Sequence, residues 1–150
     1  MKIFLSAFLS FLPISELRGG IPFALASGMH PLLAFFVCTL VNLLVAPFVF
    51  FFLDKTYYFF FRKSIEENKI IKKIKKKSIE EKIKKYGPIA LTFFVAIPFP
   101  FTGAWTGSVI AWLLRIEKKK ALFFISLGVI IAGILVTLAS LGILQILKLI

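Results

Sequence analysis

The sequence predicts an all-α integral membrane protein, and its composition, hydropathy and charge placement each favour this class. Hydrophobic residues make up 59% of the 150 positions and charged residues 17%, whereas soluble domains average about half apolar and a quarter charged. Mean hydropathy is +0.95, and long apolar runs alternate with short lysine clusters. These values exclude an ordinary soluble domain, a disordered chain and a fibrous protein.

The net charge of +12 is concentrated in two short segments. Residues 62–85 carry eleven Lys or Arg against four Glu, and residues 115–120 carry four against one. Cytoplasmic loops of membrane proteins are rich in Lys and Arg, so we expect both segments on the cytoplasmic side of the plasma membrane. Nucleic acid is not expected as a partner, because no aromatic residue punctuates the basic run to stack on bases.

Two apolar runs are long enough to cross a bilayer, whose hydrocarbon core of about 30 Å takes about 20 helical residues. The first predicts transmembrane helix 1 in residues 30–61, where Pro47 is expected to kink the helix. Asn42 in the same run is expected to bond a neighbouring helix. The second run predicts transmembrane helix 2 in residues 115–150.

The apolar block of residues 86–114 is interrupted in its middle. The run from Pro98 to Gly103 holds two prolines and a glycine, which break helical hydrogen bonding and leave two halves too short to cross alone. A single crossing would also place the two lysine clusters on opposite sides of the membrane. We therefore expect a re-entrant helical hairpin that enters and leaves on one side.

Residues 1–29 show the same pattern. An apolar segment is followed by a break from Pro13 to Pro22 and by a second apolar segment that ends near Gly28. A cleaved signal peptide is the alternative for the first segment, because Lys2 precedes the apolar run. Read as a second re-entrant hairpin, this region completes the order hairpin, span, hairpin, span. That order predicts an inverted repeat, as in many secondary transporters.

The linker of residues 62–85 contains the pentapeptide KSIEE twice. In each copy a serine precedes a glutamate by three residues, as Ser64 precedes Glu67 and Ser78 precedes Glu81, which is the capping box of a helix start. Two starts predict two short amphipathic helices. Their lysines would hold them to anionic lipid, and a solvated cytoplasmic loop is the alternative.

Glu16 and Arg18 lie in the break of the first predicted hairpin, at membrane depth. Ions at that depth are costly and normally pair, face water or serve transport. We expect the two side chains to converge in an irregular turn made by the following glycines and Pro22. An ion pair that only stabilises the turn is the alternative. Burial would favour the protonated form of Glu16, which is therefore the candidate proton carrier.

The second predicted tip carries no charge, but its broken backbone exposes amides and carbonyls. A helix that begins near Thr102 would present free amides to an anion, such as a phosphate, a carboxylate or Glu16 itself. A tight turn without a ligand is the alternative. The candidate transport, substrate or proton site at the two tips is Glu16, Arg18, Pro22, Pro98, Pro100, Thr102, Gly103, Trp105 and Thr106.

No enzyme activity, cofactor or metal is expected. The chain has one histidine and one cysteine, Cys38, so it lacks an intrachain disulfide and a cysteine-based metal cluster. No nucleophile elbow and no phosphate-binding loop occur in the sequence.

Two stretches carry a family resemblance, namely SELRGGIPFALASG at residues 15–28 and AIPFPFTGAWTGSVIAWLL at residues 96–114. They resemble the small multidrug export proteins, a family that looks related to the DedA superfamily. The resemblance implies re-entrant hairpins, and its motif positions are Glu16, Arg18, Pro22, Pro98, Pro100, Thr102, Gly103 and Trp105. DedA relatives are associated with proton-coupled transport and with movement of lipids or lipid-linked phosphates. This chain is shorter and lacks their arginine-rich second tip.

The resemblance and the residues together lead to three hypotheses. The first is a proton-coupled exporter of small molecules, with its site between the hairpin tips. The second is a translocase or scramblase of lipid or polyprenyl phosphate, and the third is a membrane scaffold organised by the basic linker. Two spans and two hairpins would form a thin wall around a pathway, so we expect a homodimer or a larger homo-oligomer among membrane lipids.

Overall fold

The computed structural model describes residues 1–56, 77–99 and 102–149. In these residues the chain is all-helical and contains no β-strand, which confirms the all-α part of the predicted class. The described helices are α1 Lys2–Phe11, α2 Glu16–Ala26, α3 Pro31–Leu43, α4 Val45–Thr56, α6 Lys77–Ala96, α7 Ala104–Leu113 and α8 Lys118–Leu149.

Two helical segments are long and apolar enough to cross a membrane, and residues 57–61 of the first predicted span fall outside the described residues. Helices α3 and α4 together provide Pro31–Thr56, 26 residues, and α8 provides Lys118–Ile146, 29 residues. At 1.5 Å per residue, each is longer than a hydrocarbon core of about 30 Å. Their outward side chains are apolar, with Phe51 68% and Leu138 63% exposed.

The first long segment is interrupted at Leu44, between α3 and α4. Pro47 has no amide hydrogen for the carbonyl of Leu43, and its ring crowds that carbonyl. Leu43 is accordingly the last residue of α3, and the amide of Leu44 donates to the carbonyl of Val41 at 3.1 Å in a tighter turn. The interruption expected from Pro47 thus lies one turn before the proline.

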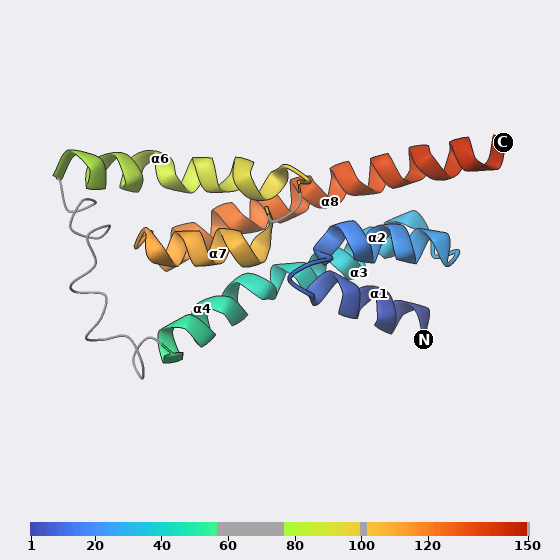
Figure 1. Ribbon diagram of the computed structural model, residues 1–150, viewed down its shortest axis with the longest axis horizontal. Coiled ribbons are helices and arrows are strands. Elements are labelled where there is room, and N and C mark those ends of the chain that lie inside the picture. The colour runs from blue at the N-terminus through green and yellow to red at the C-terminus, as the bar shows by residue number, and fades with distance from the viewer. Residues whose placement is uncertain (57–76, 100–101, 150) are drawn as a thin grey trace.

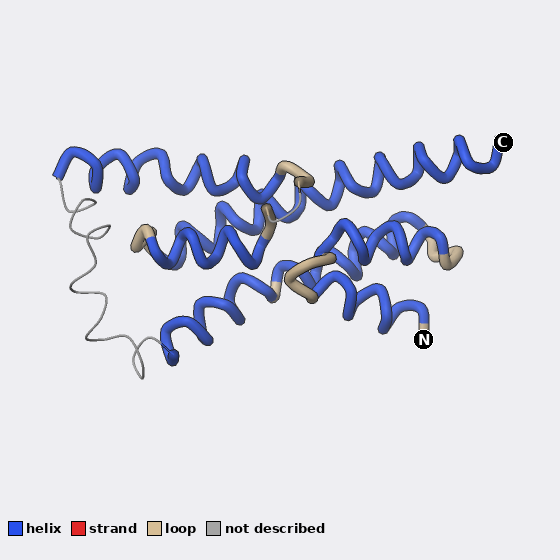
Figure 2. The backbone as a smooth tube through the Cα atoms, in the orientation of Figure 1, coloured by secondary structure: helices blue, strands red, loops and turns tan. Residues whose placement is uncertain are grey.

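Two helical hairpins lie toward opposite ends of the molecule and direct their turns to its middle (Figure 1 and Figure 2). Helices α1 and α2 form hairpin 1, and α6 and α7 form hairpin 2. The pair α3 and α4 and the long α8 run along the molecule beside them (Figure 1). Helices α1, α2 and α7 have ten or eleven residues each, so each spans about 15 Å.

The turn of hairpin 1 is shorter than the predicted break from Pro13 to Pro22. Helix α1 already ends at Phe11 and α2 begins at Glu16. Leu12, the residue before Pro13, is extended at φ −64° and ψ 140°, because a proline disfavours the helical conformation in the residue before it. One proline is therefore enough to end α1.

Pro22 lies inside α2, so the expectation that the glycines and Pro22 form an irregular turn is wrong. Pro22 removes one helical hydrogen bond, the one to the carbonyl of Arg18. Burial offsets this loss, because Ile21 is fully buried and Gly20 packs so closely on α1 that a Cβ there would overlap the Ser10 hydroxyl. Glu16 and Arg18 instead occupy the first turn of α2.

Helix α6 continues past residue 85, where the basic linker was expected to end and hairpin 2 to begin. Pro88 lies inside this helix, and α6 packs along α8. Ser78 of the second predicted capping box lies in the first described turn of α6. The first capping box, with Ser64, falls outside the described residues.

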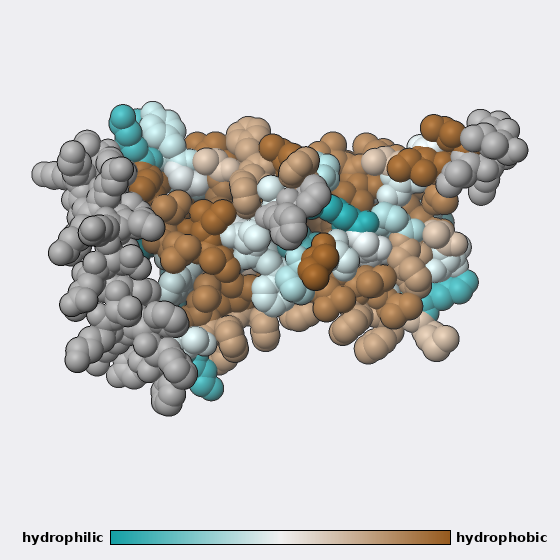
Figure 3. Space-filling view, in the orientation of Figure 1, coloured by the Kyte–Doolittle hydropathy of each residue, from teal (hydrophilic) through white to brown (hydrophobic). Residues whose placement is uncertain are grey.

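Small residues bring the helices together in the centre of the molecule. A Cβ on Gly128 would lie 2.7 Å from the Cβ of Val95, and one on Gly107 would lie 2.6 Å from its Cγ2. Val95 of α6 therefore fits between glycines of α7 and α8, as helices do in membranes. Apolar residues dominate the face seen in Figure 3, and a hydrophilic patch interrupts them near the middle.

Candidate functional site

Glu16 of hairpin 1 binds the start of α7 in hairpin 2. Its Oε1 accepts a hydrogen bond from the backbone amide of Trp105 at 3.3 Å. The first amides of a helix have no partner within the helix, and its N-terminus carries a partial positive charge. A carboxylate therefore fits this position. A phosphate, a carboxylate or Glu16 itself was expected at this helix end, and in the structure Glu16 occupies it.

Gly103 leaves the space that the Glu16 carboxylate occupies. It lies directly before α7 in an extended conformation, at φ 176° and ψ −166°, and a Cβ on it would overlap Oε2 of Glu16. Its amide donates to the hydroxyl of Thr106 at 3.1 Å, which completes the helix start. A glycine is required here because of the neighbouring carboxylate and not because of its backbone angles.

Arg18 binds the other side of the same tip. Its Nη2 donates to the carbonyl of Thr102, to the Thr102 hydroxyl at 3.1 Å and to the carbonyl of Ile97 at 3.5 Å. Ile97 directly follows α6, whose last carbonyls lack partners within the helix. Hairpin 1 thus places the negative charge of Glu16 at the N-terminus of α7 and the positive charge of Arg18 at the C-terminus of α6. Each charge is opposite in sign to the partial charge at that helix end.

A family model of small multi-drug export proteins, described as putative, matches residues 16–135. That is 120 of 150 residues, and it covers α2 with both charged residues and all of α7. The chain belongs to this family. No curated protein and no solved structure matches the chain. The family model supports the export part of the predicted resemblance, whereas the relation to the DedA superfamily stays a prediction.

In this member of the family, the second tip closes on itself around Thr102. The Thr102 hydroxyl donates to the carbonyls of Ile97 and Phe99, both at 2.8 Å, and accepts from the amide of Phe99 at 3.3 Å. Pro98 is exposed beside this turn. Pro100 is a predicted site residue that lies outside the described residues. The side chain of Thr102 therefore has a structural role in the tip besides its contact with Arg18.

Trp105 connects the tip to helices α1 and α4. Its Nε1 donates to the carbonyl of Phe11 at 2.8 Å, and its ring meets those of Phe11 and Phe48 edge to face, at centroid distances of 5.8 and 6.1 Å. Phe11 and Phe48 could not be predicted as neighbours of the site, because two among nineteen phenylalanines carry no distinguishing signal in the sequence.

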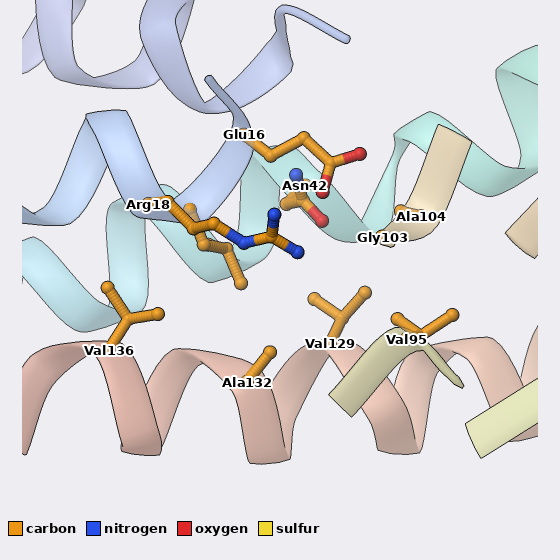
Figure 4. A pocket seen from close by; sticks show the side chains of 10 residues that line it. Glu16, Arg18, Asn42, Val95, Gly103, Ala104, Val129, Ala132 and Val136 are labelled. Atoms are coloured by element: carbon orange, nitrogen blue, oxygen red, sulfur yellow. The ribbon is translucent and has the colours of Figure 1, made fainter. Parts of the chain in front are cut away.

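Two small pockets flank Glu16 and Arg18, and both are lined by residues of the two hairpins. The first also reaches Asn42 and the apolar residues of α8 (Figure 4). It encloses about 240 Å³ including its open mouth, and its enclosed part has room for about one water molecule. The second is lined by Pro13, Ile14, Glu16, Arg18, Thr102 and Thr106. The tips are therefore closed on each other in this conformation.

The remaining predicted residues fall into two groups. Thr106 is part of the start of α7, next to the site, whereas Pro22 lies one helical turn beyond Arg18 inside α2. Asn42 forms the interhelical bond expected of it, from Nδ2 to the carbonyl of Ser10 at 2.8 Å. Its place in the pocket with Glu16 was not predicted. Within the described residues, no cluster of three or more His, Cys, Asp or Glu could bind a metal.

Proposed function

We propose that this family member is a secondary transporter in which Glu16 carries the coupling proton. The family match and the two candidate spans indicate a membrane transporter. The contact between Glu16 Oε1 and the Trp105 amide supports the finer proposal. An ionisable side chain at membrane depth is costly, so its presence there favours a role in transport.

We further propose that both hairpins are re-entrant and enter from opposite faces of the membrane. Their position toward opposite ends of the molecule, with turns that meet in the middle, supports this arrangement (Figure 1). Each unit of hairpin plus span would then be inverted relative to the other, as in many transporters. The basic linker would lie in the cytoplasm.

Protonation of Glu16 is the switch in this mechanism. The ionised carboxylate is attracted to the positive end of α7 and so holds hairpin 1 against hairpin 2. A protonated carboxyl group carries no net charge, and that attraction is lost. The tips then separate, and the space that opens between them admits substrate. Glu16 then releases its proton on the other side of the membrane, and the ionised carboxylate closes the tips again.

Transport by reconstituted protein tests the proton role. Proteoliposomes with a pH gradient are loaded with ethidium, and its efflux is followed by fluorescence. We expect Glu16→Gln to abolish the pH dependence of efflux. Glu117→Gln is the control, because Glu117 is fully exposed and its hydrogen bond with Lys120 lowers its pKa, so it stays ionised over the tested range. Equal pH dependence in wild type and Glu16→Gln would refute the proton role.

A second measurement reports on the tips without a substrate. The chain has two tryptophans, Trp105 and Trp112, so a Trp112→Phe background leaves Trp105 as the only indole. We expect its fluorescence to change with pH as the tips separate, and we expect Glu16→Gln to remove that change. A pH-independent signal in the Trp112→Phe protein would contradict the switch.

The same vesicles separate the alternative functions. Movement of a fluorescent phospholipid between leaflets, without ethidium efflux, would favour a lipid translocase. A membrane scaffold would instead depend on the basic linker. Deletion of residues 64–85 would then abolish the function of the protein, while substitutions at the tips would be tolerated. Mass measurement in detergent tests the proposed homo-oligomer.

A further inference from the structure

Asn42 is a buried amide at the centre of the molecule. It is the penultimate residue of α3 and only 1% exposed. Its Nδ2 donates to the carbonyl of Ser10 in α1 at 2.8 Å. A carbonyl oxygen can only accept a hydrogen bond, so this contact determines which side-chain atom is the nitrogen. The other atom, Oδ1, is therefore the acceptor.

Oδ1 of Asn42 accepts no hydrogen bond from any described residue, and the Asn42 side chain lines the same pocket as the Glu16 carboxyl group (Figure 4). Among the fully enclosed side-chain atoms of the described residues, Thr39 Oγ1 is the one without a partner, so Oδ1 of Asn42 borders the open space of the pocket, where a donor can reach it. The same pocket contains the side chain whose protonation is proposed to drive transport.

Protonation gives Glu16 the donor that Oδ1 lacks. An ionised carboxylate only accepts hydrogen bonds, whereas a protonated one carries an O–H that must donate to an acceptor. Arg18 is the only other charged residue lining either pocket, and it is bound to Thr102. The other elements around the pocket contribute apolar or uncharged residues: Val95 of α6, Gly103 and Ala104 at α7, and Val129, Ala132 and Val136 of α8.

We propose that Asn42 is the hydrogen-bond acceptor for protonated Glu16. This inference rests on the proposed function and adds a positioning residue to it. Ionised Glu16 binds α7, and protonated Glu16 turns to Asn42, which is itself bonded to Ser10. Asn42 thereby stabilises the protonated form and sets the pH at which the tips separate.

Infrared difference spectroscopy on the full chain in lipid vesicles tests this proposal without a substrate. The protonated carboxyl band that is lost in Glu16→Gln belongs to Glu16, and its growth as pH falls gives a midpoint pH. In Asn42→Ala we expect the band to move to higher wavenumber, because its O–H loses an acceptor. We also expect the midpoint to fall by about 0.5 to 1 pH unit, a three- to tenfold loss of proton affinity.

Two further variants make the result decisive. Asn42→Ser takes the place of Asn42→Ala if the alanine variant does not fold. Serine keeps a polar group at the position but is too short to reach both partners, so the band should move in the same direction. Thr39→Val changes another buried residue of α3 outside the pocket and should move neither band nor midpoint. Unchanged band and midpoint in the Asn42 variants would overturn this inference and leave the proton role of Glu16 intact. If wild type shows no Glu16 band at any pH, the proposed function itself is wrong.

Discussion

The carboxylate of Glu16 fills the space in which residue 103 would otherwise carry a side chain. A Cβ on Gly103 would overlap Glu16 Oε2, while Oε1 accepts the hydrogen bond from Trp105. Glu16 has φ of 46°, a left-handed conformation that few residues other than glycine adopt. Such strain persists only where the surroundings enforce it, and it is common at functional sites. Hairpin 1 thus holds a strained acid against a glycine of hairpin 2.

Gly103→Ala should displace the Glu16 carboxylate from α7. We expect a loss of about 1 to 3 kcal/mol in stability, because the half-buried acid loses its partner. Thermal unfolding of the purified protein in detergent measures this loss. The effect of Gly103→Ala should largely disappear in a Glu16→Ala background, since the clash is then gone. Gly142→Ala is the matched control, because nothing lies within 4 Å of that position. Additive effects of the two substitutions would contradict the contact.

Arg18→Lys should weaken the contact between the hairpins although it keeps the charge. The guanidinium reaches three acceptors from one nitrogen, and a lysine ammonium is more strongly hydrated than a guanidinium, so it is more costly to hold in this partly buried contact. We expect a loss of about 1 to 2 kcal/mol in unfolding free energy. Thr102→Val removes one of the three acceptors and also the hydroxyl's own bonds to the carbonyls of Ile97 and Phe99, so we expect at least as large a loss. A lysine variant as stable as wild type would show that charge alone suffices.

Thr39→Val should leave stability unchanged or raise it by up to about 1 kcal/mol, because an unpaired buried hydroxyl is replaced by a methyl group of similar size. The Thr39 hydroxyl is buried and has no hydrogen-bond partner among the described residues. Thr92→Val is the comparison, since the Thr92 hydroxyl donates to the carbonyl of Phe124 at 2.9 Å. We expect that variant to lower the melting temperature. The opposite order of the two variants would be incompatible with the structure.

Asp54→Ala should loosen the end of α4 from α7 and α8. One Asp54 oxygen accepts from Trp112 Nε1 at 3.1 Å, and the other pairs with Lys118. Asp54→Asn keeps an acceptor for the indole and loses only the exposed ion pair, which is worth about 0 to 1 kcal/mol. We therefore expect the alanine variant to be the less stable one. The wild-type protein should lose more stability at high salt than either variant, and equal salt dependence in all three would argue against the pair.

Patterns in the sequence were sufficient to predict two helical segments that are long and apolar enough to span a membrane, and a break in each of the two shorter apolar blocks. The second tip was found from Pro98 and Gly103, because a proline and a glycine act on the local backbone whatever surrounds them. The first break was predicted to extend to Pro22, which is wrong because Pro22 lies inside α2. A proline disfavours a helix there too, but close packing around the buried Ile21 offsets this effect. Predictions from proline and glycine were therefore correct where no close packing opposed their effect on the backbone.

Composition, hydropathy and charge determined by themselves that this chain is a helical membrane protein with polar residues concentrated at broken segments. These properties depend on transfer from water to lipid, which acts on each segment separately. Only the tertiary structure decided that Glu16 lies over Gly103 and beside Asn42, because these residues are far apart in the chain. Contacts of this kind depend on how whole helices pack, and no local pattern in the sequence encodes them.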